Sequence, residues 1–414
     1  MAVKVQRQTL GDYFTLQRGT TYKSKLLGQP GPVLLGLATI QRNGGFRTDS
    51  LKTYGGGSPE KLLVQPGELY LSLKDVTQSA DLLGAVARLP RDHAPGRLTQ
   101  DTVKLEPKAP DVPLDYLYWL LRTPQYRSYC RAHATGTTNL GLAREDFLAF
   151  PAPEPTSAQQ KIVETLSALD EKIELNRRIN ETLEAMARAL FKSWFVDFDP
   201  VRAKAEGRDP GLPKVIADLF PDRFEDSELG EIPAGWGVGP LDDVLVLQRG
   251  FDLPATQRKP GRYPVVAASG PSGTHDECMV RGPGVTTGRS GVLGKVFYVH
   301  EDFWPLNTSL WVKEFRHSKP AYAYHLLRRL DFGVFNAGSA VPTLNRNHVH
   351  NLPTLKPPIQ LIDAFENFAV CSLRGQRKNG DESQVLAGLR GALLPNLISG
   401  EIRIAERRSM CEAL

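Results

Sequence analysis

The sequence of 414 residues contains little cysteine and no long apolar run. Its four cysteines, Cys130, Cys278, Cys371 and Cys411, form no Cys-x-x-Cys pair, which argues against a zinc site and against a disulfide framework. No apolar stretch approaches the roughly 18 residues that a membrane helix needs. The opening residues, MAVKVQRQTLGDY, lack the apolar core of a secretion signal. We therefore expect a cytoplasmic protein with reduced thiols and no membrane partner.

The sequence also lacks the motifs of common nucleotide-using enzymes and nucleases. Segment 282–296, GPGVTTGRSGVLGKV, approaches a phosphate-binding loop, but Arg289 replaces the first glycine and Val296 replaces the required Ser or Thr. A glycine-rich turn between two strands is the better interpretation. The Glu-Pro-Lys and Asp-Glu-Lys fragments, at Glu106 and Asp170, do not follow a Pro-Asp on a strand, as a metal-dependent nuclease site would require. Neither kind of site is predicted here.

Two further motifs are missing from the chain. No Asn-Pro-Pro-Tyr or Asp-Pro-Pro-Tyr methylation motif occurs, and no His-Glu-x-x-His zinc motif occurs. We interpret His348 and His350, two positions apart, as loop residues rather than metal ligands. The sequence therefore predicts no catalytic residue, no metal site and no cofactor in this chain.

The charge of the chain is divided into blocks of different sign. Residues 1–155 carry 19 basic and 14 acidic side chains, a net charge of +5, and residues 236–358 carry 14 and 9, again +5. Residues 156–235 carry 11 and 16, a net charge of −5, and residues 359–414 carry 7 and 7. Two basic blocks suit a polyanion such as DNA, although +5 alone is weak support.

The two basic blocks share a repeated sequence. LGDYFTLQRGTTY begins at Leu10 and LDDVLVLQRGFDL begins at Leu241, an offset of 231 residues. TGTTNLGLAREDFLAFPAPEP and AGSAVPTLNRNHVHNLPTLKPP match later in the blocks at an offset of 202, so the second copy is about 29 residues shorter. The matched pairs there are Gly136 and Gly338, Leu142 and Leu344, Arg144 and Arg346, Pro151 and Pro353, and Pro155 and Pro357. We interpret this pattern as the duplication of a two-part unit, a domain followed by a helix.

Each block has the pattern of an α+β domain. The runs GPVLLGLATI, GELYLSL and GKVFYV lie between glycine and proline and predict strands. PLDYLYWLLRTPQYRSYCRAHA in the first block and PAYAYHLLRRLDF in the second each predict one amphipathic helix that begins after a proline.

A long helical pattern follows each block. In the first, apolar residues recur at alternating steps of four and three, with two asparagines in the middle of the stripe: Ile162, Leu166, Leu169, Ile173, Asn176, Asn180, Leu183, Ala187, Leu190 and Trp194. This heptad pattern predicts a rod of roughly 38 residues, about 57 Å long, that packs against another helix. An amphipathic helix on a core is the alternative. Polar residues in such a seam can fix its register.

The second helical pattern is less regular. Phe365 and Phe368 open the stripe, after Leu361, and Leu386, Leu389, Leu393 and Leu397 close it. Gly375 and Gly380 interrupt the middle and predict a loosened rod or two shorter helices. We expect the two long helices to pack on each other, and if antiparallel to hold the domains at opposite ends.

These features resemble the DNA-specificity subunits of type I restriction–modification enzymes. The most specific segments are RRINETLEAMARALFKSWFVDFDPVRAK and DLFPDRFEDSELGEIPAGW, which look like the central conserved region of the family and the entry to its second domain. QTLGDYFTLQRG, TGTTNLGLAREDF and LLPNLISGEI also fit. The resemblance implies two similar α+β target-recognition domains, each followed by a long helix, with the two helices pairing as an antiparallel coiled coil.

The resemblance also implies a division of labour. Each domain would read one half of a split, asymmetric sequence in double-stranded DNA, and the paired helices would set the gap. Two modification subunits using S-adenosylmethionine would methylate adenine, and restriction subunits using ATP and Mg²⁺ would complete the complex. The expected parts are a first target-recognition domain at 1–155, a helical spacer at 156–198, a connector at 199–235, a second target-recognition domain at 236–358 and a C-terminal helical spacer at 359–414.

Polar turns at corresponding places in the two blocks are candidates for DNA contacts, because base edges and phosphates are read by such side chains. In the first block they are Arg18, Thr20, Thr21, Lys23, Lys74, Gln78, Thr137, Thr138, Asn139 and Arg144. In the second block they are Arg249, Arg289, Ser290, Lys295, Asn345, Arg346 and Asn347. Two other functions stay open: a stand-alone regulator that binds split sites, and a nuclease or methyltransferase with an unrecognised active site.

Overall fold

A computed structural model describes residues 8–49, 51–137, 139–332 and 343–399. The chain divides into two compact units. Unit 1 comprises Met1–Glu174 together with Glu382–Leu414, and unit 2 comprises Leu175–Asp381. Each unit therefore takes one domain and part of each long helix. Within the described residues, no helix is long and apolar enough to span a membrane.

Unit 1 begins with a mixed domain. Its helices and strands are α1 (Leu10–Tyr13), β1 (Phe14–Arg18), η1 (Ser24–Leu26), β2 (Val33–Leu35), η2 (Leu37–Thr39), η3 (Glu60–Leu62), β3 (Leu63–Val64), β4 (Leu69–Ser72), β5 (Lys74–Asp75), β6 (Val86–Arg88), β7 (Gly96–Leu98), β8 (Thr102–Pro107), α2 (Leu114–Leu120), α3 (Pro124–Ala132), β9 (Ala134–Thr135), β10 (Leu140–Leu142) and α4 (Arg144–Leu148).

Antiparallel pairing joins four of these strands in the order β1-β8-β4-β6. A second sheet has the order β2-β7-β3, with β2 and β7 parallel. Strand β4 is buried along its whole length, because its two faces contribute to separate apolar clusters: Leu69 and Leu71 to one, Tyr70 to the other. The strand predicted at GELYLSL is thus confirmed.

The single helix predicted from Pro113 onward was wrong. Two helices, α2 and α3, replace it, and the chain turns between them at Thr123. The Thr123 hydroxyl accepts a hydrogen bond from the Tyr126 backbone N–H at 3.3 Å, so it caps the start of α3. Proline at the first position of α3 fits a helix start and disfavours helical backbone at the residue before it.

Unit 2 contains the second mixed domain and the connector. Its elements are α6 (Asp199–Ala205), α7 (Lys214–Ala217), β11 (Phe224–Ser227), β12 (Gly230–Pro233), β13 (Gly237–Pro240), α8 (Leu241–Val244), β14 (Leu245–Arg249), η4 (Ala255–Gln257), β15 (Tyr263–Ala267), β16 (Gly270–His275), β17 (Gly284–Gly288), β18 (Val296–Val299), β19 (Trp304–Pro305), β20 (Ser309–Phe315), α9 (Pro320–Arg329), α10 (Arg346–His350) and β21 (Pro353–Lys356).

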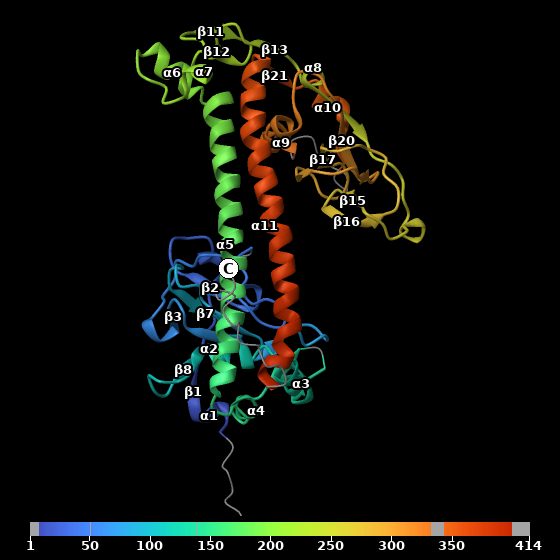
Figure 1. Ribbon diagram of the computed structural model, residues 1–414. Coiled ribbons are helices and arrows are strands. Elements are labelled where there is room, and N and C mark those ends of the chain that lie inside the picture. The colour runs from blue at the N-terminus through green and yellow to red at the C-terminus, as the bar shows by residue number, and fades with distance from the viewer. Residues whose placement is uncertain (1–7, 50, 138, 333–342, 400–414) are drawn as a thin grey trace, which may run out of the picture. The chain divides into compact units, whose positions relative to one another are not determined.

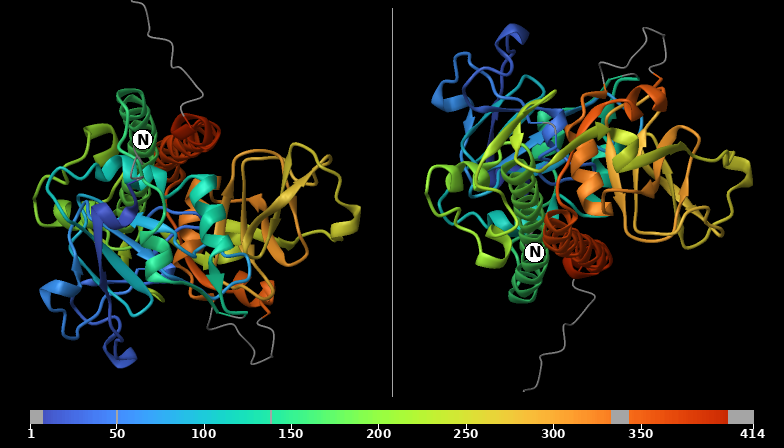
Figure 2. Two further views of the ribbon diagram at one scale, coloured as in Figure 1. Left: turned by 90° about the horizontal axis from the view of Figure 1, so that it is seen from below. Right: turned by 90° about the horizontal axis from the view of Figure 1, so that it is seen from above.

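The main sheet of unit 2 repeats that of unit 1. Its order is β14-β20-β17-β18, all antiparallel, and its side sheet, β16-β15-β19, again contains one parallel pair. The strands can be followed in yellow and orange in Figure 2. The prediction of two similar α+β domains is confirmed. The glycine-rich segment 282–296 is the β17–β18 hairpin, as predicted.

The entry and exit of each domain are paired in the same way. The Leu10 N–H donates to the Phe150 carbonyl at 3.0 Å, and the Leu241 N–H donates to the Leu352 carbonyl at 2.8 Å. The proline-marked exits of the repeat thus return beside its opening strands. The connector between the domains is ordered and irregular, with two short helices and the β11–β12 hairpin.

The two long helices are α5 (Ser157–Phe195) and α11 (Ile359–Ser399), coloured green and red in Figure 1. They pack on each other within both units. In unit 1, Asp170 pairs with Arg390, and in unit 2 Phe191 packs on Phe365 at a centroid distance of 5.4 Å. Residue numbers rise on one helix as they fall on the other, so the pair is antiparallel, as predicted.

Most of the proposed seam lies in the interface or against a core. The buried members are Ile162, Leu166, Asn176, Trp194 and Phe365, and the half-buried members are Leu169, Ile173, Asn180, Leu183, Leu190, Phe368, Leu386 and Leu393. Leu389 is an exception, because its side chain is 49% exposed. The assignment of Leu389 to the seam, between Leu386 and Leu393, was therefore wrong.

Polar side chains occupy the middle of the helix pair. The Asn180 amide donates to the Gln376 carbonyl at 3.1 Å, and the Asn379 amide donates to the Asn180 side-chain oxygen at 2.8 Å. The Asn176 amide donates to the Asn379 carbonyl at 3.4 Å. Because each bond fits only one alignment of the helices, this cluster favours a single register.

The expected break at Gly375 and Gly380 was wrong, since α11 is continuous through both. A Cβ atom at Gly375 would lie 3.2 Å from Cδ1 of Leu183, so the missing side chain lets the helices approach closely. Packing along the rest of the interface outweighs the helix-propensity cost of about 1 kcal/mol per glycine.

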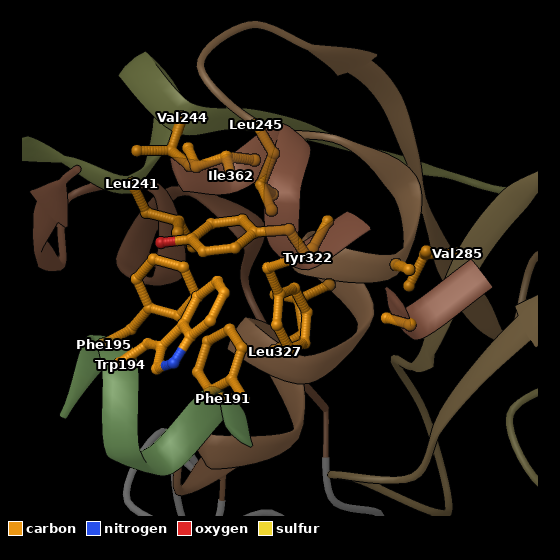
Figure 3. Close-up of a cluster of buried hydrophobic side chains, with 14 of the residues drawn as sticks. Phe191, Trp194, Phe195, Leu241, Val244, Leu245, Val285, Tyr322, Leu327 and Ile362 are labelled. Atoms are coloured by element: carbon orange, nitrogen blue, oxygen red, sulfur yellow. The ribbon is translucent and has the colours of Figure 1, made fainter. Parts of the chain in front are cut away.

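An aromatic cluster fixes the end of the helix pair in unit 2 to the domain (Figure 3). Phe191, Trp194 and Phe195 of α5 point toward Tyr322 of α9. The rings of Phe195 and Tyr322 meet edge to face, with centroids 5.1 Å apart. Glu366 of α11 accepts the Ala321 and Tyr322 N–H groups at 3.0 and 2.9 Å, which orients α9.

A buried ion pair fixes the domain of unit 1 to the helices. The Arg122 guanidinium donates to the Asp170 carboxylate at 2.9 Å and to the Tyr118 hydroxyl at 2.9 Å. Arg390 of α11 binds the other oxygen of Asp170. One carboxylate therefore joins the domain, α5 and α11 of this unit.

Candidate nucleic-acid interface

The main sheet of unit 1 brings several candidate residues to one end. Arg18 ends β1 opposite Val103, and Ser72 ends β4 opposite Thr102, the first residue of β8. The segments that follow β1 and β4 therefore leave the sheet at the same end. Arg18 at the end of β1 and Lys74 just after β4 therefore lie at this end, and both side chains are exposed.

The glycine of the repeated Leu-Gln-Arg-Gly motif lets two backbones meet at this end. A Cβ atom at Gly19 would lie 2.1 Å from the Thr99 carbonyl oxygen, and one at Gly250 would lie 2.3 Å from the Leu306 oxygen. Only glycine fits such an approach. The repeated glycine therefore occupies the position at which the chain leaves the main sheet in each of the two domains.

Residues after Gly19 have different surroundings. The Thr20 hydroxyl accepts a hydrogen bond from buried Arg97 at 3.0 Å, and the Thr21 carbonyl accepts another at 3.2 Å. Arg97 also lies over the Tyr54 ring, 4.9 Å from its centroid. Thr20 therefore helps to fold the turn, while the Lys23 side chain is exposed.

A second group of candidates surrounds the short sheet β5-β10-β9. Lys74 pairs with Gly141, and its ammonium lies 3.2 Å from Asp101. Thr137 and Asn139 are exposed in the turn between β9 and β10, and Gln78 is exposed in the loop after β5. Thr138 lies outside the described residues.

Arg144 is engaged inside the domain. From the first position of α4, its guanidinium donates to the Leu16 carbonyl of β1, so it holds that helix on the sheet. In unit 2 the corresponding strand is held by His350 of α10, whose Nε2 accepts the Leu247 N–H at 2.9 Å. Burial lowers the pKa of His350, in keeping with a neutral imidazole that accepts this bond.

Sequence reasoning missed this role of His350. Arg346, which aligns with Arg144, is instead exposed on α10. The Asn345 side chain caps α10 by accepting the Asn347 N–H at 3.0 Å, and Asn347 is exposed. Only the pairing of α10 with β14 could have revealed the histidine, because no motif marks it.

The remaining candidates of unit 2 lie at the same end of its main sheet as in unit 1. Arg249 ends β14, 3.5 Å from Asp252. Arg289 follows β17 and donates to the Asn307 carbonyl at 3.3 Å. Ser290 pairs with Thr343 in an isolated antiparallel β-bridge. Lys295 precedes β18, and its side chain is exposed. Arginine, lysine and hydroxyl groups therefore gather at equivalent ends of two equivalent sheets.

Such side chains can bind phosphates and donate to base edges. Among the described residues, no group of three or more His, Cys, Asp or Glu side chains could hold a metal ion. The chemistry that this surface offers is recognition of a polyanion.

Comparisons with known proteins agree with this interpretation. The family model "Type I restriction modification DNA specificity domain" matches residues 3–185. The type I restriction enzyme MjaIX specificity subunit of Methanocaldococcus jannaschii is 26% identical over 328 residues, which cover 70% of this chain and 70% of that protein. The HindI specificity subunit of Haemophilus influenzae is 42% identical over 119 residues, covering 28% of this chain and 26% of that protein.

A solved structure shows the same fold over nearly the whole chain. The S subunit of a type I restriction–modification system from M. genitalium superposes with a TM-score of 0.60 at 15% identity. The match covers 96% of this chain and 98% of that one. With its duplicated sheets and antiparallel helix pair, the chain therefore has the fold of that S subunit, and its residues 3–185 match the DNA specificity domain of type I restriction–modification enzymes.

Proposed function

We propose that this chain reads a two-part, asymmetric sequence in double-stranded DNA, with one domain on each half, and contributes no catalytic residue of its own. The observation that carries the proposal is the repeated sheet whose equivalent ends present different polar loops. The similar sheets would place the loops of the two domains in equivalent positions. The loops themselves differ, so each domain would recognise a different DNA sequence. The domains would extend over 1–155 and 236–358, with helical spacers at 156–198 and 359–414 and a connector at 199–235. We place the protein in the cytoplasm, where its DNA lies.

A domain exchange tests the two-reader proposal. Residues 10–150 are replaced by the matching segment of a relative with a different target, and the variant is expressed with its modification subunit. Mapping of methylated adenines should then reveal one changed half and one unchanged half. If both halves changed together, the proposal would be wrong. DNA cleavage or methylation by the purified chain alone would favour a catalytic function instead.

The proposal includes two modification subunits, one on each long helix. In unit 2, α5 exposes Leu175, Ile179 and Met186, which are 50%, 39% and 49% exposed. In unit 1, α11 exposes Val385 and Leu389, which are 63% and 49% exposed. Apolar stripes on long helices suit helical partners. These partners would use S-adenosylmethionine, and restriction subunits using ATP and Mg²⁺ would join them.

Charged substitutions on the two stripes test this docking. Met186→Glu and Leu389→Glu should each remove one modification subunit from the complex, measured as its mass by light scattering. Val215→Glu is the matched control, since Val215 is 81% exposed on α7 outside both stripes. Retention of two subunits by both variants would contradict the docking sites. Stable DNA binding without any modification subunit would favour a stand-alone regulator.

We also propose that helix length sets the gap between the two half-sites. A heptad added to both α5 and α11 lengthens the pair by about 10 Å, which is about three base pairs of DNA. Insertion in α5 alone would leave the seam without partners and should abolish methylation. An unchanged gap after paired insertion, read from the mapped target, would contradict the role of the helices.

A further inference from the structure

One loop of the main sheet differs in length between the two units. Residues 73–85 join β4 to β6 in unit 1, and the shorter segment 289–295 joins β17 to β18 at the equivalent place in unit 2. Both begin at a matching backbone bond: Leu142 N–H donates to Leu73 at 2.9 Å, and Leu344 N–H donates to Arg289 at 2.8 Å. A loop that varies on a constant frame is a natural place for specificity.

A buried carboxylate holds the first part of the unit 1 loop. Asp75 is fully buried, and its Oδ1 accepts both the Thr77 N–H and the Thr77 hydroxyl at 2.8 Å. Its Oδ2 accepts the Leu82 N–H at 2.7 Å. The carboxylate therefore ties the two sides of the loop together. Hydrogen bonds to a charged group are the stronger kind.

A buried guanidinium holds the last part of the loop. Arg127 of α3 is 3% exposed and donates to three carbonyls, those of Ala80 at 2.8 Å, Asp81 at 3.0 Å and Leu83 at 2.6 Å. Ala80 is held at φ +53°, a left-handed conformation that costs a non-glycine residue roughly 1–2 kcal/mol. A strained backbone conformation of this kind persists only where the surrounding contacts hold the residue in place.

The clamped loop presents an apolar side chain to solvent. Val76 is 63% exposed, beside exposed Thr77 and Gln78. The loop leaves the β5–β10 ladder where Asp75 faces Leu140, so Val76 and Asn139 emerge from the ladder together. Val76 contributes nothing to the core, yet two buried charges fix the loop that displays it.

We propose that Val76 and Gln78 read base edges in the major groove of the first half-site, at an A·T pair. This inference rests on the proposed DNA-reading function. A valine methyl group packs on the C5-methyl group of thymine, and a glutamine amide donates and accepts at the N6 and N7 atoms of adenine. Lys74, at the base of the loop, contacts a phosphate and fixes the orientation.

A thymine-to-deoxyuridine series tests the valine contact. The specificity subunit in complex with its modification subunits is titrated with duplexes that carry its mapped target, in which each thymine of the first half-site is replaced singly by deoxyuridine. At one position the loss of the methyl group should weaken binding about fourfold, the effect of one buried methyl group. The Val76→Ala complex should bind the two duplexes equally, because its partner for that methyl group is gone.

Matched variants separate this inference from the proposed function. Gln78→Ala should lower the preference for the same A·T pair at least about tenfold and leave the second half-site unchanged. Val215→Ala, which alters an exposed valine on α7, should change neither. If the wild-type complex has no sequence preference, the proposed function fails. If it has one, but uracil, Val76→Ala and Gln78→Ala leave it unchanged, or the half-site lacks an A·T pair, only this inference fails.

Discussion

The repeated glycines provide a direct test of how each domain holds its reading end. We predict that Gly19→Ala damages unit 1 and Gly250→Ala damages unit 2. The new Cβ atom would lie 2.1 Å from the Thr99 oxygen in one case and 2.3 Å from the Leu306 oxygen in the other. Since ordinary contacts begin near 3.4 Å, a backbone must move by about 1 Å in each domain.

The magnitude follows from what has to move. Overpacking that side chains relieve costs about 1–3 kcal/mol, and here the obstacle is backbone, so we expect about 3 kcal/mol from each substitution. The Gly19 N–H bond to the Thr102 carbonyl and the Gly250 N–H bond to the Ser309 carbonyl, both 3.1 Å, would be weakened by the same movement. For units of about 200 residues this cost lowers Tm by about 6–12 °C.

The assay combines thermal unfolding with mapping of the methylated target in the reconstituted complex. Gly19→Ala should lower Tm and loosen the first half-site only, and Gly250→Ala should loosen the second only. Gly57→Ala is the control, because no atom lies within 4 Å of the added Cβ. A Gly19→Ala protein with unchanged Tm and an unchanged first half-site would refute the close-approach reasoning.

Three further predictions concern the helices and a buried histidine. Gly380→Ala and Gly388→Ala should each raise the unfolding free energy by about 0.5–1 kcal/mol in denaturant titrations, since the added methyl groups meet open space inside a helix. Asp170→Ala should lower it by about 3–5 kcal/mol, because Arg122 would keep a buried, unpaired charge. Burial lowers the pKa of His325 in the folded protein from 6.5 to about 4. Between these pH values the unfolded chain binds a proton at this histidine that the folded protein does not bind. The unfolding free energy should therefore fall as pH drops from 6.5 toward 4.

The predictions for Asp170 and His325 each have a matched control. Lys172→Ala breaks the exposed ion pair with Glu382 and should cost under about 1 kcal/mol, so an equal loss from Asp170→Ala would contradict the buried-pair argument. His325→Phe keeps an aromatic ring on Phe191 but cannot titrate, and should flatten the pH dependence over that range. An unchanged slope would contradict the assignment of this titration to His325.

The duplicated frame could be predicted because its determinants are local. Leu16 and Leu247 are buried in equivalent strands, and Gly19 and Gly250 lie where the backbone passes close to another segment. The same short motif therefore occurs in both domains. The α5 stripe was also readable, since a heptad pattern without glycine or proline has few other structures available.

The errors arose where tertiary contacts outweigh local preference. Gly375 predicted a weak point in α11, yet its missing side chain allows close packing against Leu183. The break before Pro124 had a local signal, a threonine followed by proline, which the amphipathic pattern on either side concealed. Leu389 matched the stripe by spacing, but its side chain is half exposed.

The candidate site was harder to predict, because position in the sequence does not reveal which polar groups the fold uses internally. Arg144 and Thr20 were chosen as polar turn residues, but their side chains bond to Leu16 and Arg97 inside the domain. Arg127 carried no signal as a clamp, since burial of a charged residue depends on carbonyls about 45 positions away in the chain.

The separation between shared sheet residues and differing loop residues explains how one chain with two similar domains could read an asymmetric DNA target. Residues that build the frame recur in both domains, as Gly19 and Gly250 do, because any change there disturbs a shared backbone contact. Loops between equivalent strands are free of that constraint and differ in length and chemistry, with Val76 on one and Lys295 on the other. On the proposed function, we expect new DNA targets to arise by exchange of residues 73–85 or 289–295 while the sheets and helices stay unchanged. A chimera that moves only residues 76–79 into a relative should carry part of the first half-site preference with it. If only exchange of the whole domain transferred that preference, the frame itself would take part in reading the sequence.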